Sequence, residues 1–137
     1  MLPSKEAHEP SHLPQGLSLL LVEDDLELAA VMRRWALWVG VNLDVASRGA
    51  DALRLIMEKS YAVVLMDLSL PDMEGAALHD RIVEVCPLLA PRIIILTGGA
   101  VNGQARTFLE STSCPVMLKP FDLLNLAREI AQLDRAA

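Results

Sequence analysis

Short apolar runs recur along the chain and are separated by longer segments of helical periodicity. The apolar runs occupy residues 17–22, 62–66, 92–96 and 114–118, and residues 41–46 alternate between apolar and polar positions. An apolar run bounded by turn residues is typical of a strand that is buried on both faces, as in a parallel sheet. The pattern therefore predicts five strands.

The segments that follow these runs predict five helices. The first lies between Asp25, a suitable N-cap, and Gly40. The others lie at residues 49–59, 75–85, 102–111 and 122–133, and Asp122 can cap the last. Helical spacing selects the inward-facing residues. They are Leu28, Val31, Met32, Trp35 and Val39; Leu53, Ile56 and Met57; Leu78, Ile82 and Val85; Ala105, Phe108 and Leu109; and Leu123, Leu126, Ala127 and Ile130. We expect both tryptophans, Trp35 and Trp38, in core packing rather than in a cofactor site.

A strand followed by a helix, five times over, predicts one α/β domain. Such alternation forms a parallel sheet with right-handed crossovers and helices on both faces. The length of 137 residues suits a single domain. Residues 1–16 carry three prolines and little periodicity, so we expect a flexible N-terminal tail and a domain over residues 17–137.

Composition narrows the functional class. The chain is 53% apolar but only 4% aromatic, which suits an aliphatic sheet core, and its formal net charge of −6 argues against direct nucleic-acid binding. No apolar run approaches the ~20 residues of a membrane span, and no secretory signal is evident. Cys86 and Cys114 have neither CxxC nor zinc spacing. We expect a cytoplasmic protein with reduced cysteines.

One motif in the tail is misleading. His8-Glu9-Pro10-Ser11-His12 matches the HExxH zinc pattern. That chemistry needs both histidines on one face of a helix, and Pro10 would interrupt the helix. Without an evident third ligand, we do not assign a metalloprotease site. His79, in the third helix, is expected to be solvated or packed rather than a ligand.

Polar residues stand where the predicted strands end. Glu23, Asp24 and Asp25 follow the first strand, Asp67 follows the third, Thr97 the fourth and Lys119 the fifth. Parallel strands bring all their carboxyl ends to one edge of the sheet, where ligands of such folds bind. Gathered carboxylates repel one another, so a cation is expected among them, and Mg²⁺ is the usual choice for oxygen ligands.

This set of residues suits the transfer of a phosphoryl group to a carboxylate. Asp67 would be the nucleophile, the metal and Lys119 would neutralise the phosphoryl oxygens, and Thr97 would donate a hydrogen bond. Any one of these residues could simply cap a helix or end a strand. Their joint occurrence at strand ends favours the functional interpretation.

Four motifs carry a family resemblance: LLLVEDD at the first strand, VVLMDLSLPDMEG at the third, IIILTGG at the fourth and PVMLKPF at the fifth. Over residues 17 to about 133 the chain resembles the receiver domain of bacterial two-component response regulators. The resemblance implies a flavodoxin-like, doubly wound (βα)5 sheet with strand order 2-1-3-4-5. It also implies a signalling domain that catalyses only its own phosphorylation and dephosphorylation.

The resemblance assigns roles to the residues of the site. Asp67 would accept the phosphoryl group of a phosphohistidine on a histidine kinase or phosphotransfer protein. Mg²⁺ would be bound by Asp24, Asp67 and the backbone carbonyl of Ser69, with Glu23 acting through water. Thr97 would be the switch hydroxyl, and Lys119 would pair with the phosphoryl group. The Lys119-Pro120 peptide bond is usually cis in the family.

Three positions concern the switch and its lifetime. Family members often carry Tyr or Phe where this chain has Val116, so an aromatic readout is not expected. Ser69 and Gly99 lie where the family tunes the lifetime of the acyl phosphate, and both are small. The LTGGA and SCPVMLKPFD stretches look most like receivers attached to hybrid histidine kinases. Whether the receiver stands alone or was excised from a larger protein stays open.

Two alternatives remain. A pseudo-receiver would bind partners without phosphorylation, and Val116 is the one residue that favours it. A haloacid dehalogenase-type phosphohydrolase would need a second Asp two residues after the nucleophile, where this chain has Ser69. The downstream target is unidentified, and by family analogy a homodimer through the face of the last helix is expected.

Overall fold

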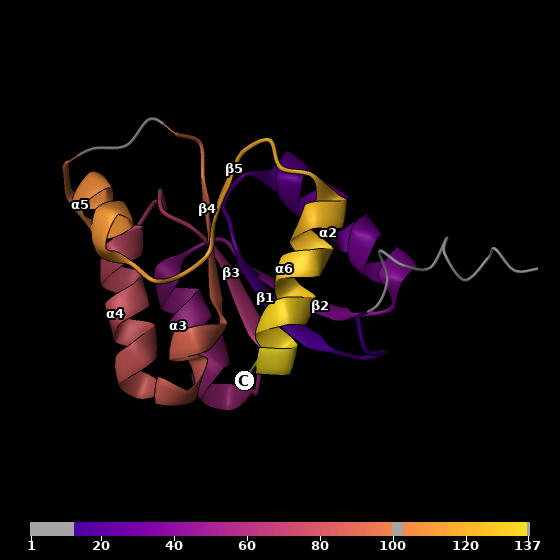
Figure 1. The fold of residues 1–137 in the computed structure, drawn as a ribbon. Helices are drawn as coiled ribbons and strands as arrows, with labels where there is room; N and C mark the ends of the chain where they lie inside the picture. The colour runs from indigo at the N-terminus through magenta and orange to yellow at the C-terminus, as the bar shows by residue number, and fades with distance from the viewer. Residues whose placement is uncertain (1–12, 100–102, 137) are drawn as a thin grey trace, which may run out of the picture.

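A five-stranded parallel sheet forms the centre of the molecule. The computed structural model describes residues 13–99 and 103–136. The strands are β1 (Ser18–Val22), β2 (Asn42–Ala46), β3 (Val63–Asp67), β4 (Ile93–Thr97) and β5 (Val116–Leu118). They pair in the order β2-β1-β3-β4-β5, all parallel, as the family resemblance implied (Figure 1).

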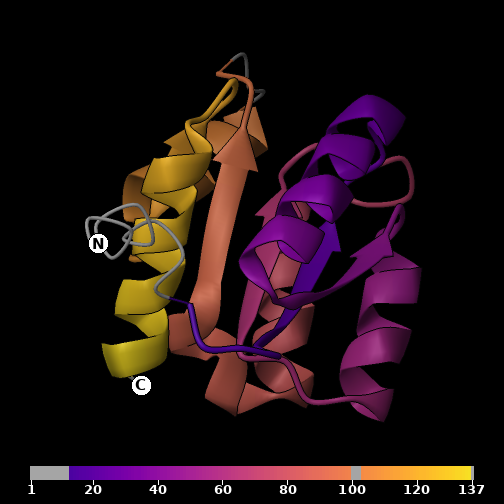
Figure 2. The same cartoon turned by 90° about the vertical axis from the view of Figure 1, so that its right-hand side faces the viewer.

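Helices cover both faces of the sheet. They are α2 (Leu26–Val39), α3 (Gly49–Glu58), α4 (Gly75–Val85), α5 (Gly103–Ser111) and α6 (Leu123–Ala136), and a 3-10 helix, η2, spans Pro87–Arg92. α2 and α6 pack on one face, whereas α3, α4 and α5 pack on the other (Figures 1 and 2). Each expected helix is therefore present, and Pro87 and Pro91 both lie in η2.

The apolar runs form the strands because both of their faces are covered. Every residue of β3 and β4 is buried. In β1, Leu19 and Leu21 contact the core on the α2 and α6 side, while Leu20 and Val22 contact the core on the opposite side. The edge strands β2 and β5 are less buried, and β2 accordingly includes the polar residues Asn42 and Asp44, whereas β5 is apolar although two of its three residues are exposed.

Helix ends follow the expected local signals. The Asp25 carboxylate accepts hydrogen bonds from the backbone N–H groups of Glu27 and Leu28, and so caps α2. Gly40 ends α2 with a φ of 84°, a left-handed conformation that glycine adopts without steric cost. Asp122 likewise accepts a hydrogen bond from the N–H of Leu124 at the start of α6.

Some residues expected in the core are exposed. The exposed fractions are 44% for Val31, 75% for Trp38, 74% for Met57 and 41% for Val85. Trp38 precedes buried Val39 by one residue, about 100° around the helix, so only Trp35 of the two tryptophans faces the sheet. Met57 and Val85 lie in the last turns of α3 and α4, where the helices end.

The last four residues of the predicted tail, 13–16, are described by the structure and contact the domain. Leu13 is 4% exposed and contacts the core on the α2 and α6 side. The Gly16 N–H donates to the Gly40 carbonyl at 2.8 Å, and the Asn42 side chain donates to the Gly16 carbonyl at 3.1 Å. Leu13 is therefore packed against the domain and the Gly16 backbone is hydrogen-bonded to it, while residues 14–16 are exposed. The rest of the predicted tail, including the HExxH match at residues 8–12, lies outside the described residues.

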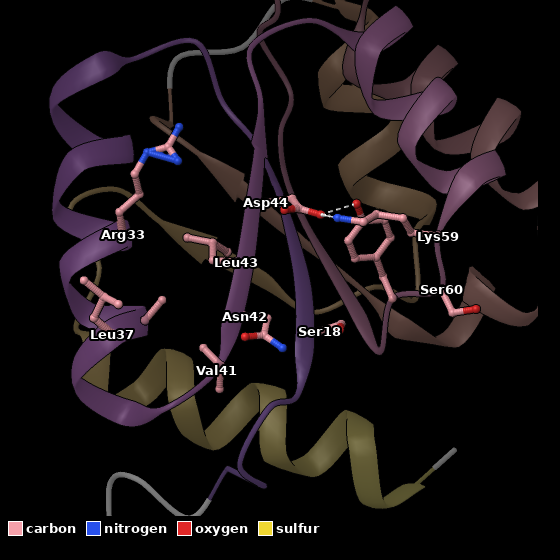
Figure 3. A pocket seen from close by; sticks show the side chains of 11 residues that line it. Ser18, Arg33, Leu37, Val41, Asn42, Leu43, Asp44, Lys59 and Ser60 are labelled. Carbon is pink, nitrogen blue, oxygen red and sulfur yellow. Dashed lines mark hydrogen bonds and ion pairs between the residues drawn. The ribbon is translucent and has the colours of Figure 1, made fainter.

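A polar contact fastens the edge strand β2 to the segment that leads into β3. The Asp44 carboxylate accepts hydrogen bonds from the Lys59 ammonium at 2.8 Å and from the Tyr61 hydroxyl at 2.6 Å (Figure 3). Both hydrogen bonds lower the pKa of Asp44, and the bond from Lys59 has the larger effect. The buried Tyr61 hydroxyl has a raised pKa, because of its burial and its bond to Asp44.

This contact predicts a loss of stability in acid. A group whose pKa is lowered by folding stabilises the protein above its unfolded pKa of about 3.9, and this contribution disappears as the pH falls. The urea midpoint of wild type should therefore fall more between pH 6 and pH 3 than the midpoint of Asp44→Asn, whose side chain at position 44 cannot titrate. Equal decreases in the two proteins would contradict the assigned role of Asp44.

Candidate functional site

The polar residues of the predicted site meet at the carboxyl-terminal edge of the sheet. Glu23 follows β1, Asp67 is the last residue of β3, Thr97 is the last of β4, and Lys119 follows β5. The strand order reverses between β1 and β3, which is where doubly wound sheets form their ligand crevice. This edge lies uppermost in Figure 1.

Lys119 links two buried carboxylates. Its Nζ lies 2.6 Å from Oε1 of Glu23 and 3.2 Å from Oδ2 of Asp67. The backbone N–H of Lys119 also donates to the Thr97 carbonyl at 2.8 Å, which ties the residue to the end of β4. The Lys119-Pro120 peptide bond is cis, as the resemblance implied.

Burial governs the electrostatics of this pair. Glu23 is only 2% exposed, and burial raises its pKa, as does the nearby charge of Asp67. Hydrogen bonds from Lys119 and from the N–H of Asp25 oppose that rise without cancelling it. Burial alone would lower the pKa of Lys119, but the bond to Glu23 and the charge of Asp67 outweigh it, so this pKa is raised.

A third carboxylate completes an acidic cluster. Oxygen atoms of Glu23, Asp24 and Asp67 all lie within 4.8 Å of one another. Asp24 is exposed, whereas the other two are buried. Lys119 is the one cation that contacts this cluster among residues 13–99 and 103–136, so three carboxylates face a single positive charge. Hard oxygen ligands with excess negative charge fit a divalent cation such as Mg²⁺.

The other predicted residues lie around this cluster. The Ser69 N–H donates to Oδ1 of Asp67 at 3.3 Å, so the backbone of Ser69 lies beside the central carboxylate. Thr97 is buried, and its hydroxyl oxygen accepts a hydrogen bond from the N–H of Gly99 at 3.3 Å. Added Cβ atoms at Gly98 and Gly99 would meet no atom within 4 Å, so this side of the site is open.

Two predicted positions are not in contact with the carboxylates. Val116 begins β5, pairs with Ile95 and is 41% exposed, so no aromatic ring occupies that surface position. His79 packs edge-on against the ring of Phe108, with 5.1 Å between ring centroids, as expected for a packed side chain.

Sequence reasoning missed one polar residue near the site. Asp72 lies in the turn after β3, and its carboxylate accepts hydrogen bonds from the N–H groups of Gly49 and Ala50 at 2.8 and 3.0 Å. The available signal was the absence of a capping side chain at the start of α3, where Arg48 occupies the N-cap position.

Comparison with known proteins identifies the family. The sequence model of the response regulator receiver domain matches residues 19–131. The chain belongs to this family.

Two relatives and one solved structure illustrate the similarity. Two-component system protein A of Emericella nidulans is 32% identical over 122 residues, covering 87% of this chain but 18% of that protein. Sensor protein EvgS of Escherichia coli is 27% identical over 135 residues, covering 96% of this chain but 11% of that protein. This receiver therefore spans under a fifth of either relative.

The solved structure is the receiver domain of sensor histidine kinase PA1611 from Pseudomonas aeruginosa PAO1, which has a magnesium ion coordinated in its active site cleft. It superposes with a TM-score of 0.76 at 26% identity, covering 88% of this chain and 98% of that one. The matches to two sensor proteins agree with the likeness to kinase-attached receivers.

The position of Lys119 predicts a stability effect. In Lys119→Met, the buried charges of Glu23 and Asp67 lose their partner, and removing one member of a buried ion pair costs up to about 3–5 kcal/mol. We expect a loss of about 2–3 kcal/mol in metal-free buffer, since Lys119 is partly solvated. Urea denaturation followed by circular dichroism measures it. Adding Glu23→Gln should restore part of the loss; equal stability of Lys119→Met and wild type would refute the interpretation.

Proposed function

We propose that this receiver accepts a phosphoryl group onto Asp67 from the phosphohistidine of a histidine kinase or phosphotransfer protein, in a Mg²⁺-dependent reaction. The observation that supports it is the contact of Lys119 with both buried carboxylates, Glu23 and Asp67, beside exposed Asp24. The chain is then a signalling domain and not a metabolic enzyme. Its expected cytoplasmic location is part of this proposal; no helix in the described residues could span a membrane.

Each residue has a part in the transfer. An oxygen of Asp67 attacks phosphorus, the P–N bond to the partner's histidine breaks, and the new bond is an acyl phosphate. Lys119, already 3.2 Å from Asp67, pairs with a phosphoryl oxygen, and the Thr97 hydroxyl donates to another. Asp24, Asp67 and the Ser69 carbonyl would hold the metal, with Glu23 acting through water. The bound metal supplies positive charge to the phosphoryl oxygens.

The charge change at Asp67 supplies the switch. Phosphorylation adds negative charge beside Lys119 and an acceptor for the Thr97 hydroxyl, whose oxygen now accepts from Gly99. Turning that hydroxyl towards the phosphoryl group would shift the segment after β4. Because Ser69 and Gly99 are both small, we expect water to reach the phosphoryl group readily. A homodimer through the α6 face is part of the proposal, carried by family analogy alone.

The alternative function is a pseudo-receiver that binds a partner without phosphorylation. The specific observation in its favour is Val116, which removes the aromatic side chain that family members use as a readout. The acidic cluster and Lys119 favour phosphorylation instead, since a binding module has no need to bury carboxylates around a cation.

Labelling with a small phosphodonor tests both functions. Acetyl phosphate and Mg²⁺ should add one phosphoryl group to wild type by intact mass spectrometry, and the adduct should be labile to base and hydroxylamine. Asp67→Asn should show none, and the control Asp80→Asn, an exposed carboxylate on α4, should label normally. No adduct in wild type would favour the pseudo-receiver.

Metal addition provides a separate prediction. Binding to the folded state alone stabilises it by RT ln(1 + [Mg²⁺]/Kd), about 2.7 kcal/mol at one hundred times Kd. The thermal midpoint of wild type should therefore rise with Mg²⁺ and return with EDTA. Asp24→Asn should lose most of the rise, whereas Asp25→Asn should keep it, because Asn caps a helix about as well as Asp and the α2 cap is preserved. An undiminished rise in Asp24→Asn would exclude it as a ligand.

A further inference from the structure

The turn after Asp67 is closed on itself. The N–H of Gly75 donates to the carbonyl of Leu68 at 2.8 Å, and Ser69 and Glu74 form an antiparallel bridge. At the base of this turn, the Ser69 N–H reaches Asp67. The segment that would supply the Ser69 carbonyl to a metal is thus a compact loop whose base adjoins the phosphoacceptor.

The tip of this loop is attached to a different part of the fold. The two carboxylate oxygens of Asp72 accept hydrogen bonds from Gly49 and Ala50, the first residues of α3, 23 and 22 positions earlier in the chain. Both amide hydrogen bonds lower the pKa of Asp72, and the bond from Ala50 has the larger effect. The carboxylate is therefore favoured in its ionised form. Because Arg48 makes no side-chain cap bond, Asp72 is the cap of α3.

Side-chain packing reinforces the attachment. A Cβ placed on Gly49 would lie 2.6 Å from Sδ of Met73, the residue after Asp72. Met73 also packs against the core on the α3 and α4 side. Glycine at position 49 therefore allows the loop to lie directly against the start of α3, at the distance that the Asp72 hydrogen bonds require.

We propose that Asp72 is a positioning residue of the phosphoacceptor site, which holds the Ser69 backbone in place for the metal by fastening the loop to α3. This inference rests on the proposed function. Without Asp72 the loop keeps its base and the packing of Leu68, Leu70 and Met73, but it loses the two hydrogen bonds that join its tip to α3, so the Ser69–Glu74 bridge is held less firmly. Metal affinity then falls because the loop must be ordered on binding.

The coupling must act in both directions. If the attachment of Asp72 to α3 favours metal binding, then metal binding favours the attachment by the same factor. Mg²⁺ should therefore slow amide hydrogen exchange at Gly49 and Ala50, although both lie on a helix that donates no ligand in the proposed site. Because Mg²⁺ also slows any exchange that proceeds through global unfolding, the slowing at Gly49 and Ala50 should exceed that at Leu124, whose N–H is capped by Asp122 at the start of α6. Equal slowing at all three amides would indicate global stabilisation alone.

Calorimetric titration with Mg²⁺ tests the proposal in wild type, Asp72→Ala, Asp72→Asn and Asp51→Asn. Outer partners of metal ligands are worth roughly 10–100-fold in affinity, and Asp72 is one step further away, so we expect Kd to rise about three- to tenfold in Asp72→Ala. Asp72→Asn keeps one acceptor oxygen, so its Kd should rise less than that of Asp72→Ala. Asp51→Asn removes the same charge from the first turn of α3 without touching the loop, and should match wild type.

The outcomes separate the possible explanations. The proposal would be overturned if Asp72→Ala had the same Kd as wild type. It would also be overturned if Kd rose equally in all three variants, because the loss of one negative charge would then explain the effect. Mg²⁺-independent exchange at Gly49 and Ala50 in wild type would also overturn it. If wild type itself binds no Mg²⁺, the proposed function falls and this inference with it. Far-UV circular dichroism verifies that each variant is folded. If Asp72→Ala does not fold, Asp72→Asn is compared with wild type in its place.

Discussion

Two carboxylates buried close together at the end of a parallel sheet repel each other unless a cation lies between them, and the rest of the site follows from that constraint. Glu23 and Asp67 end neighbouring strands, β1 and β3, at the centre of the sheet. The cation that meets them, Lys119, comes from the far edge strand, 96 positions after Glu23. The pair therefore exists only once β4 and β5 have joined the sheet, so the chemistry of the site depends on the completed fold.

The topology makes this arrangement natural. Parallel strands send every carboxyl end to the same edge, so residues far apart in sequence meet without any dedicated binding domain. Strands such as β3 and β4, which are buried along their whole length, supply the apolar contacts that stabilise the sheet. The polar residues can then occupy the strand ends, where backbone N–H groups such as that of Ser69 are available to them.

Much of this could be predicted from the sequence, for identifiable reasons. Uninterrupted apolar runs identified the central strands, and the polar residue after each run identified Glu23, Asp67, Thr97 and Lys119. The strand order and the cis bond before Pro120 came from the family resemblance, since no periodicity encodes them. The metal-binding role of the Ser69 carbonyl stays a prediction from that resemblance. Periodicity misplaced Val31, because a helix on a sheet buries a narrower stripe than its apolar residues suggest. The separate expectation that Trp38 packs in the core was also wrong. Asp72 escaped notice because its partners at residues 49 and 50 are close only in space.

The helices differ in how firmly they are held. α2 buries five residues, whereas the described side chains of α5 include one fully buried residue, Ala105, with Phe108 and Leu109 partly covered. Elements with little buried apolar area open at low free energy and are the first to exchange between conformations. α5 is also the first helix after Thr97, so a small energetic input there can displace it while the sheet stays intact. The receiver thus combines central strands that are buried along their whole length with a surface helix that has little buried apolar area.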